Sequence, residues 1–302
     1  MKNITPSQLP FDVFALCAPL HVDTGIANNI WMEELSKKDR GLDKEKFIGQ
    51  WFNFYNVLAA NSLVYLIPSK EGLQDQTYVN CAIYMPHIKE EDTIVLGKFT
   101  ARGRQGEEEV AGRLFQEMGY KVVQCPYKLE GEAELKYSGK DNIYYGGYGI
   151  RSDIKAHEWL EEKLGAKVIK LREKDPYLYH LDCNLFVISK NDIILNTGAF
   201  SKKTIKEIEK ITNIHSVGED EAYQGICNSL RVGDMLCNAS SLAYMKSTDK
   251  YYMEEVRKNA ELEKICDKVG IELMYFDMSE AWKSGALLSC FCMHLNHRNM
   301  DY

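Results

Sequence analysis

Apolar residues recur at helical spacing in five separate segments of the chain. In the first segment, Phe47, Trp51 and Tyr55 lie at intervals that place them on one face of a helix. Ser152 and Ser201, whose hydroxyls can cap a helix, precede two of the other segments. The pattern predicts helices near 45–60, after Gln105, after Ser152, after Ser201 and near 251–269.

Short runs rich in β-branched and aromatic residues lie between these helices and predict strands. The predicted strands are 63–68, 80–85, 93–99, 121–126, 142–148, 167–172, 181–189, 192–197 and 271–277. The helix starts recur at intervals of roughly 50 to 60 residues, a period typical of repeat architectures. Each unit therefore has the order strand, strand, helix, strand, with small variations.

Five such units could close into a ring in which each helix packs against its neighbours. An open α/β sheet with helices on both faces fits the same periodicity, so the pattern leaves both architectures open. The chain contains no low-complexity tract and no spacer rich in Pro or Gly. We therefore expect residues 1–302 to form a single domain.

Composition and charge narrow the class of protein. The net charge of -7, without a long basic run, argues against nucleic acid and anionic membranes as partners. No apolar stretch approaches the roughly 18 residues of a membrane span, and no signal peptide precedes the first strand. The nine cysteines are scattered and include no metal-binding spacing, since Cys290 and Cys292 are the only close pair. These features predict a cytoplasmic protein with reduced thiols and no bound metal.

Three short segments carry residues suited to catalysis. Cys290 ends an apolar run and is either a nucleophile or a buried structural thiol. His180 and Asp182 would share one face of a strand, which suits proton transfer, although a surface histidine fits the same pattern. In 129–134, three carboxylates alternate, and in a strand they would share a face at a high cost unless a cation binds there. A solvated acidic loop is the alternative.

The Gly-rich segment 146–153 leads into a predicted helix. It lacks both the G-x-G-x-x-G pattern and the Lys-Ser/Thr ending of a phosphate-binding loop, so we do not expect nucleotide binding. Arg151 in this segment is instead suited to a bidentate contact with a carboxylate.

The order of these segments resembles the guanidine-modifying, or pentein, superfamily over nearly the whole chain. The superfamily includes arginine deiminases, dimethylarginine dimethylaminohydrolases, amidinotransferases and arginine dihydrolases. The bacterial group of arginine dihydrolases and dimethylaminohydrolase-like proteins is the most similar. The motifs that carry the resemblance are Cys17-Ala18-Pro19, Asn29-Ile30-Trp31-Met32, the segment Gly72 to Asn80, Tyr179-His180-Leu181-Asp182 and Cys227-Asn228. The resemblance implies a five-bladed ββαβ propeller.

The resemblance also implies a role for each matching residue. Cys290 resembles the nucleophile, His180 the acid/base, and Glu130 the carboxylate that holds the guanidinium and assists proton transfer. The other implied substrate-binding residues are Asp182 and Asp75, the asparagines Asn29 and Asn80, the α-carboxylate binders Arg151 and Arg104, and Glu134. No cofactor and no metal is implied.

Two departures from the family pattern bear on the activity. The family's Glu-Gly-x-Gly-Asp is Glu130-Gly131-Glu132-Ala133-Glu134 here, so that Ala133 and the longer Glu134 replace Gly and Asp. Dimethylaminohydrolases and deiminases carry an aspartate where this chain has Cys81. That loss argues against plain deiminase or dimethylaminohydrolase activity.

The expected function is hydrolysis of the guanidinium group of arginine or a close derivative, in the manner of an arginine dihydrolase. An amidinotransferase, with an amine in place of water, is the first alternative, and an arginine deiminase or dimethylarginine dimethylaminohydrolase is the second. An inactive protein that binds a guanidino ligand or a partner protein is the third. The expected partner is a small guanidino substrate, and the chain could also form a homo-oligomer.

Overall fold

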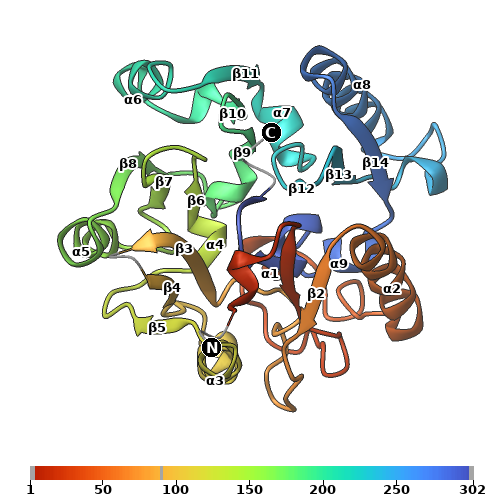
Figure 1. Ribbon diagram of the computed structural model, residues 1–302. Coiled ribbons are helices and arrows are strands. Elements are labelled where there is room, and N and C mark those ends of the chain that lie inside the picture. The colour runs from red at the N-terminus through yellow and green to blue at the C-terminus, as the bar shows by residue number, and fades with distance from the viewer. Residues whose placement is uncertain (1–3, 89–90, 299–302) are drawn as a thin grey trace.

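Five three-stranded sheets form the framework in the computed structural model, which describes residues 4–88 and 91–298. Figure 1 shows these sheets arranged around a common centre with the long helices on the outside. In the first three sheets, the strands are β15 (Cys292–His294), β1 (Val13–Leu16) and β2 (Leu63–Leu66); β3 (Ala82–Ile88), β4 (Glu91–Leu96) and β5 (Lys121–Gln124); and β6 (Leu135–Tyr137), β7 (Ile143–Tyr148) and β8 (Lys167–Arg172). The other two sheets contain β9 (Leu185–Ser189), β10 (Asp192–Asn196) and β11 (Asn213–Val217); and β12 (Leu230–Val232), β13 (Met235–Ala239) and β14 (Glu272–Phe276).

Every sheet repeats one topology. The middle strand runs antiparallel to one neighbour and parallel to the other. A parallel partner requires a crossover connection, and a helix supplies it in each unit. These crossover helices are α2 (Lys44–Asn61), α3 (Glu107–Glu117), α5 (Ile154–Leu164), α6 (Lys202–Ile208) and α8 (Tyr252–Val269). Four shorter helices lie in the loops: α1 (Ile30–Glu34), α4 (Gly131–Glu134), α7 (Glu219–Tyr223) and α9 (Ser279–Trp282).

The five helices predicted from periodicity are confirmed, and so is the repeated sheet-and-helix unit. On α2, Phe47, Trp51, Phe54 and Leu58 are buried along one face, as the apolar spacing requires. The side chain of Ser201 caps α6 by accepting from the backbone N–H of Thr204, as expected.

Some boundaries differ from the prediction. The residue that precedes α5 as its N-cap is Asp153 and not Ser152. The predicted strand 181–189 begins with a 3-10 turn at Leu181–Cys183, and β9 starts at Leu185. The pattern also missed β1, β6, β11, β12, β13 and β15, which are three to five residues long.

The first sheet joins the two ends of the chain. β15 pairs antiparallel with β1, so that Phe14 lies opposite His294. Beyond β15, the buried Asn296 accepts from the backbone N–H of Val13 at 3.1 Å and donates to the carbonyl of Phe11 at 2.8 Å. Asn296 therefore satisfies backbone groups that the sheet leaves open.

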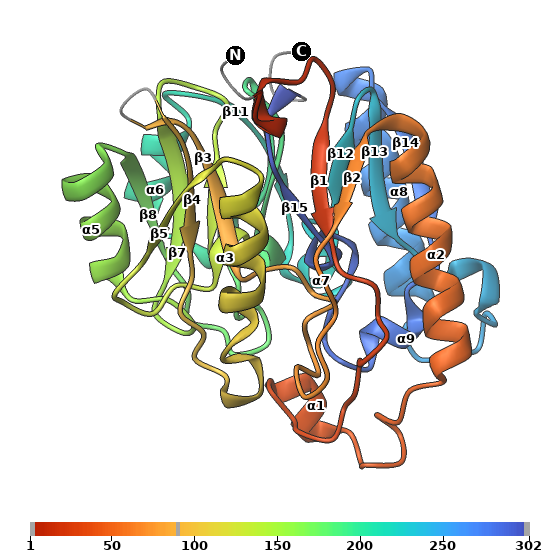
Figure 2. The same ribbon diagram turned by 60° about the horizontal axis from the view of Figure 1, so that its bottom comes forward.

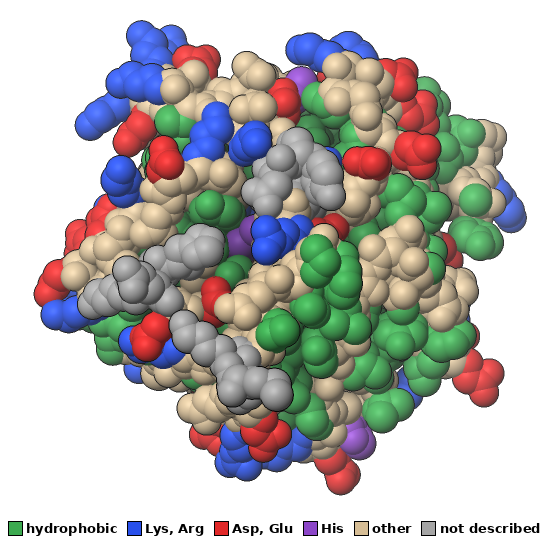
Figure 3. All heavy atoms as spheres, in the orientation of Figure 1, with side chains coloured by type: hydrophobic (Ala, Val, Ile, Leu, Met, Phe, Trp, Pro, Cys, Tyr) green, Lys and Arg blue, Asp and Glu red, His purple; other side chains and the backbone are tan. Residues whose placement is uncertain are grey.

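The surface is mixed in character, with charged and apolar side chains on the same face of the molecule (Figure 3). Figure 3 shows charged side chains of both signs over one face, with apolar side chains gathered near β2 and α2. Figure 2 shows α1 and α9 at one end of the molecule, away from β1 and β15. Over the described ranges, no helix is both long and apolar enough to cross a membrane.

We expect Asn296→Ala to destabilise the fold, because it leaves the buried N–H of Val13 without an acceptor. A loss of about 1–3 kcal/mol in the free energy of unfolding is anticipated for such a group. Urea unfolding measures it. The control is Asn61→Ala, since the exposed Asn61 donates to the carbonyl of Val57 on the surface of α2. Equal stability of the two variants would contradict the proposed link between the chain ends.

Candidate active site

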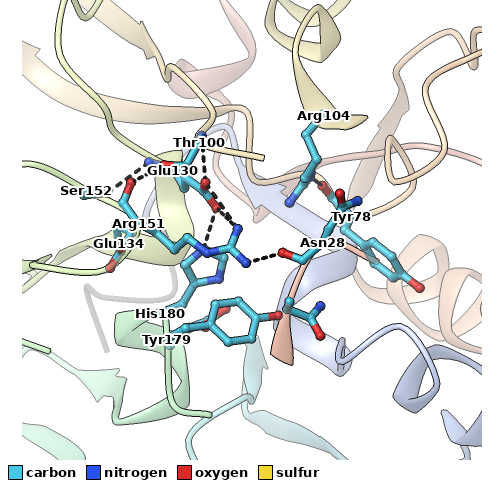
Figure 4. Close-up of polar contacts among 12 residues, drawn as sticks. Asn28, Tyr78, Thr100, Arg104, Glu130, Glu134, Arg151, Ser152, Tyr179 and His180 are labelled. Atoms are coloured by element: carbon cyan, nitrogen blue, oxygen red, sulfur yellow. Dashed lines mark hydrogen bonds and ion pairs between the residues drawn. The ribbon is translucent and has the colours of Figure 1, made fainter. Parts of the chain in front are cut away.

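Loops from all five units supply the candidate residues. Asn29 precedes α1, Asp75 and Asn80 lie between β2 and β3, and Arg104 precedes α3. Glu130 and Glu134 lie between β5 and β6, Arg151 between β7 and α5, His180 and Asp182 between β8 and β9, and Cys290 between α9 and β15. Nine of these ten residues are buried, and the Arg151 side chain is 12% exposed. The fold therefore brings most of them into one region, as Figure 4 shows in part.

Glu130 is the most densely bonded of the buried carboxylates. It accepts from the His180 ring at 2.7 Å, from the Thr100 backbone N–H at 3.0 Å, and from Arg151 at 3.3 Å (Figure 4). Burial alone would raise the pKa of Glu130, but His180, Arg151 and Arg104 lower it to about 2. Glu130 is therefore ionised, and its charge can hold His180 in position to move a proton.

A glycine lets the Glu130 loop approach its neighbour. Gly131 has φ +50°, and a Cβ atom there would lie 2.2 Å from the carbonyl oxygen of Asn80. Any side chain would therefore push Glu130 away from the backbone of Asn80. Asn80 itself is buried, and its backbone N–H donates to the carbonyl of Tyr78.

Cys290 lies beside a second carboxylate. Its Sγ is 3.9 Å from Asp182 Oδ2 and 3.5 Å from Asn228 Nδ2. The hydroxyl of Ser289 donates to the same Asp182 oxygen at 2.9 Å. Burial and the charge of Asp182 raise the pKa of Cys290 to about 11. The resting side chain is therefore a neutral thiol at pH 7, and it needs a positive charge nearby to become a nucleophile.

One short turn connects the two halves of the site. His180 and Asp182 are two residues apart, and the 3-10 turn at Leu181–Cys183 separates their side chains. His180 meets Glu130, whereas Asp182 meets the Cys290 thiol. The prediction of a strand was wrong here, because a turn and not a pleat directs these side chains.

The alternating carboxylates of 129–134 do not share a face. This segment forms the short helix α4, so its carboxylates point in different directions. Glu130 bonds His180, Glu132 bonds His294, and Glu134 accepts from the backbone N–H of Leu181 at 3.2 Å. The prediction of one common acidic face was therefore wrong, although two of the three carboxylates do border the His180 turn.

Both candidate arginines are already paired with carboxylates. Arg104 makes a bidentate contact with Glu107, with nitrogen–oxygen distances of 2.8 and 3.1 Å. Arg151 contacts Glu130, donates to the carbonyl of Asn28, and stacks over the ring of Tyr179 with its guanidinium carbon 4.7 Å from the ring centre. Neither guanidinium points a free fork toward a ligand in this state.

The remaining two candidates also have local partners. Asp75 accepts from the side chain of Asn28, and burial raises the pKa of Asp75. Asn29 caps α1 by accepting from the Met32 N–H at 3.0 Å, and it donates to the carbonyl of Ser284 at 2.9 Å. Asn29 therefore ties α1 to the loop that leads to Cys290.

Several known proteins are similar to this chain. AgrE of Nostoc sp., a bifunctional arginine dihydrolase/ornithine cyclodeaminase, is 25% identical over 95% of this chain and 38% of its own length. The dimethylarginine dimethylaminohydrolase of Mycobacterium tuberculosis is 25% identical over 94% of this chain and 85% of its own. The chain spans about a third of the length of the cyanobacterial relatives it matches. No protein-family model matches it.

Solved structures show that the fold is shared. The N-terminal domain of ArgZ, an arginine dihydrolase from cyanobacteria solved with bound product, superposes with a TM-score of 0.79 at 23% identity over 94% of this chain and 97% of that domain. The dimethylaminohydrolase of Pseudomonas aeruginosa, solved with citrulline, gives 0.69 at 17% identity over 94% and 99%. The expected resemblance to arginine dihydrolases and dimethylarginine dimethylaminohydrolases is confirmed by the relatives at 25% identity. The solved structures confirm the fold.

Some residues of the candidate site were not predicted from the sequence as site residues. Asn228 and Ser289 contact Cys290 or Asp182, and Asn28 accepts from Arg151 and donates to Asp75. The Cys227-Asn228 motif marked Asn228 as part of the resemblance, but it indicated no contact with the thiol. Glu173, which follows β8, had no signal at all.

Glu173 and Glu134 form a pair of buried carboxyl groups behind the His180 turn. A Cβ atom on Gly147 would lie 2.3 Å from Glu134 and 2.9 Å from Glu173, so both carboxyl groups fill the space that this glycine leaves. Burial raises the pKa of Glu134 to about 7, and burial together with Glu134 raises the pKa of Glu173. The two groups therefore share at least one proton at neutral pH.

The described residues contain no group of three His, Cys, Asp or Glu side chains arranged to hold a metal ion. All nine cysteines, including Cys81 and Cys292, are free thiols. The candidate site contains a thiol, an imidazole and several carboxyl groups.

We expect Glu173→Gln to weaken the pH dependence of stability. Both pKa values lie above the ordinary 4.5 in the folded protein, so folding takes up protons between about pH 4.5 and 7. The parent protein should therefore lose stability as pH rises through this window, and the variant should lose less because its amide carries no proton to release. Urea unfolding at pH 5 and pH 8 measures the difference. The exposed Glu162→Gln should behave like the parent, and equal losses in all three proteins would refute the shared proton.

Proposed function

We propose that this protein is a cysteine-dependent hydrolase of guanidino compounds, acting on arginine or a close derivative in the manner of an arginine dihydrolase. The observation that carries the proposal is the charge of the site. Glu107 and Glu130 are paired with arginines, and Glu134 and Glu173 share at least one proton. Among the described residues, the buried Asp182 beside Cys290 has only hydroxyl and thiol partners. A guanidinium ligand would supply the missing positive charge and match the planar geometry of carboxylate pairs.

The proposed mechanism uses three side chains. The Cys290 thiolate attacks the guanidinium carbon, and His180, held by Glu130, donates a proton to the departing nitrogen so that ammonia leaves. A water then attacks the carbon of the covalent amidino-thioether, and His180 accepts its proton. The carbon–sulfur bond breaks, which releases the hydrolysed product and returns Cys290. In the dihydrolase reaction, two such rounds use two waters and convert arginine to ornithine, carbon dioxide and two ammonia molecules.

Asp182 has two opposing effects in this scheme. Its charge raises the pKa of Cys290 in the empty site, and it attracts a guanidinium to the thiol. Once the cation is bound, its positive charge offsets Asp182 and favours the thiolate. Activation of the nucleophile is therefore coupled to the arrival of a cationic substrate, which protects the resting thiol from other electrophiles.

The architecture and setting belong to the same proposal. We propose that the five units close into a pseudo-symmetric five-bladed propeller, and that residues 1–302 form one catalytic domain. The pairing of β15 with β1 supports closure, because it joins the ends of the chain in one sheet. A cytoplasmic location and a homo-oligomeric state stay predictions. The roles of Asn29, Asn80, Arg104 and Arg151 in substrate binding also stay predictions, since all four have partners within the protein.

Product analysis tests the function directly. We expect the protein to convert L-arginine to ornithine with two ammonia molecules per arginine, and we expect Cys290→Ser to abolish this turnover. Cys292→Ser, at a second buried thiol in the next strand, should retain it and serves as the control. Citrulline as the sole product would indicate a deiminase, and turnover dependent on an added amine would indicate an amidinotransferase. Turnover by Cys290→Ser near the parent rate would refute the nucleophile.

Alkylation rates test the coupling of charge and reactivity. We expect 2-chloroacetamidine, a cation, to inactivate the protein faster at pH 7 than neutral chloroacetamide does, because only the cation offsets Asp182 beside a thiol whose pKa is about 11. Asp182→Asn should narrow the difference between the two reagents by removing the attracting charge. The measurement is the rate of loss of the Cys290 thiol by mass spectrometry. A neutral reagent that reacts as fast as the cation would contradict the proposal.

A further inference from the structure

An aromatic cavity lies beside the candidate active site and has no part in the mechanism above. Trp31, Tyr177, Tyr223 and Trp282 line it. Their rings contact one another: the Trp31 ring centre is 4.9 Å from Tyr177, 6.3 Å from Tyr223 and 6.0 Å from Trp282. These rings come from α1, α7, α9 and the loop before His180, which are distant in sequence. Four aromatic rings border this space, and the face of an aromatic ring attracts a cation.

The inner end of this cavity borders residues that contact the candidate nucleophile. The inner part encloses about 430 Å³, some of it open to solvent, and Cys183 and Asn228 also line it. Asn228 Nδ2 is 3.5 Å from Cys290 Sγ, and Cys183 follows Asp182 in the chain. A ligand among these aromatic rings therefore lies one side chain away from the reacting sulfur.

The outer end of the cavity is acidic. It continues into a wider space of about 1260 Å³, part of it open to solvent, which the same four rings line together with Glu34, Asp220 and Glu254. No Lys or Arg is among the described residues that line either part. Two cations lie nearby: Arg257 is 3.6 Å from Glu254, and Lys250 lies over the ring of Tyr251, with its Nζ 4.7 Å from the ring centre. The charged residues that line the cavity are therefore all acidic.

Hydrogen bonds strengthen the preference for a cation. The Tyr177 hydroxyl donates to Glu34, and the Tyr223 hydroxyl donates to Asp175. A phenol that donates to a carboxylate gains electron density in its ring, which increases its attraction for a cation. The carboxylates therefore act on a ligand both through their own charge and through the rings.

We propose that this aromatic vestibule, defined by Trp31, Tyr177, Tyr223 and Trp282, is a subsite for an alkylammonium group. The ammonium would lie against the rings and near the acidic rim, with its alkyl chain directed toward Asn228 and Cys290. The group can come from the amine-bearing tail of a guanidino substrate or from a separate amine that attacks the covalent intermediate in place of water. The catalytic consequence rests on the proposed function, whereas the binding does not.

Calorimetric titration with n-butylammonium tests the binding independently of turnover. We expect saturable binding of n-butylammonium and none of butyrate, which has a similar chain and the opposite charge. Trp282→Leu should weaken the binding roughly twofold to thirtyfold, the range of a cation–π contact. Asp220→Asn should weaken it as well, because it removes a rim charge. The control is Trp159→Leu, since the half-buried Trp159 lies on α5, away from the vestibule. Absence of saturable binding, or equal affinity in Trp282→Leu and the parent, would overturn the proposal.

A second experiment identifies the source of the ammonium. L-Arginine, agmatine and 4-guanidinobutyrate share the guanidinium but differ in the tail, which is zwitterionic, cationic or anionic. If the tail occupies the vestibule, Trp282→Leu should raise KM for agmatine and arginine and leave KM for 4-guanidinobutyrate unchanged. If a separate amine occupies it, putrescine added with arginine should become amidinated in the parent and not in Trp282→Leu. Failure of all turnover with retained n-butylammonium binding would refute the proposed function and leave the subsite standing.

Discussion

The pairing of buried carboxylates is the constraint on which the rest of this site depends. An ionised carboxylate removed from water is stable in a protein only when charges or hydrogen bonds compensate it. Glu130 is compensated fully, by His180, Arg151 and a backbone N–H, and its pKa falls to about 2. Glu134 and Glu173 are compensated by protons instead. The same physical requirement therefore produces an ionised Glu130 and, four residues later, a Glu134 that shares a proton with Glu173.

Among these buried carboxylates, Asp182 is the one that we propose binds the ligand. Its partners are the Ser289 hydroxyl and the thiols of Cys290 and Cys183, and none of these carries a positive charge. A buried carboxylate whose partners are all neutral is poorly compensated while the site is empty. It therefore attracts a cation to the neighbouring thiol. In the proposed mechanism, the reactivity of Cys290 and the affinity for a guanidinium have one common cause, which is the charge of Asp182.

The repeated fold makes this arrangement possible because it delivers loops from five units to one end of the molecule. Each of five apolar clusters packs one crossover helix against strands of two neighbouring sheets. The clusters therefore hold adjacent units together, and the loops can carry polar residues. Close approach between loops depends on small residues: Gly131 lets Glu130 pack against the Asn80 backbone, and Gly147 leaves room for Glu134 and Glu173. The convergence of loops also produces the aromatic vestibule, because its four rings come from four different connections between strands.

The sequence by itself determined the five crossover helices, the repeated unit, and the identity of Cys290, His180, Glu130 and Asp182 as candidates. Helical periodicity depends only on residues that are near one another in the sequence. The order of the motifs can likewise be read along the chain without knowledge of tertiary contacts. The tertiary structure decided which groups meet. His180 contacts Glu130 across 50 residues, and Asp182 contacts Cys290 across 108. It also decided that Gly131–Glu134 forms a helix and not a strand, that Arg104 and Arg151 are paired, and that Glu173 adjoins Glu134. Such contacts depend on how separate units pack, and a local pattern of polar and apolar residues contains no record of that packing.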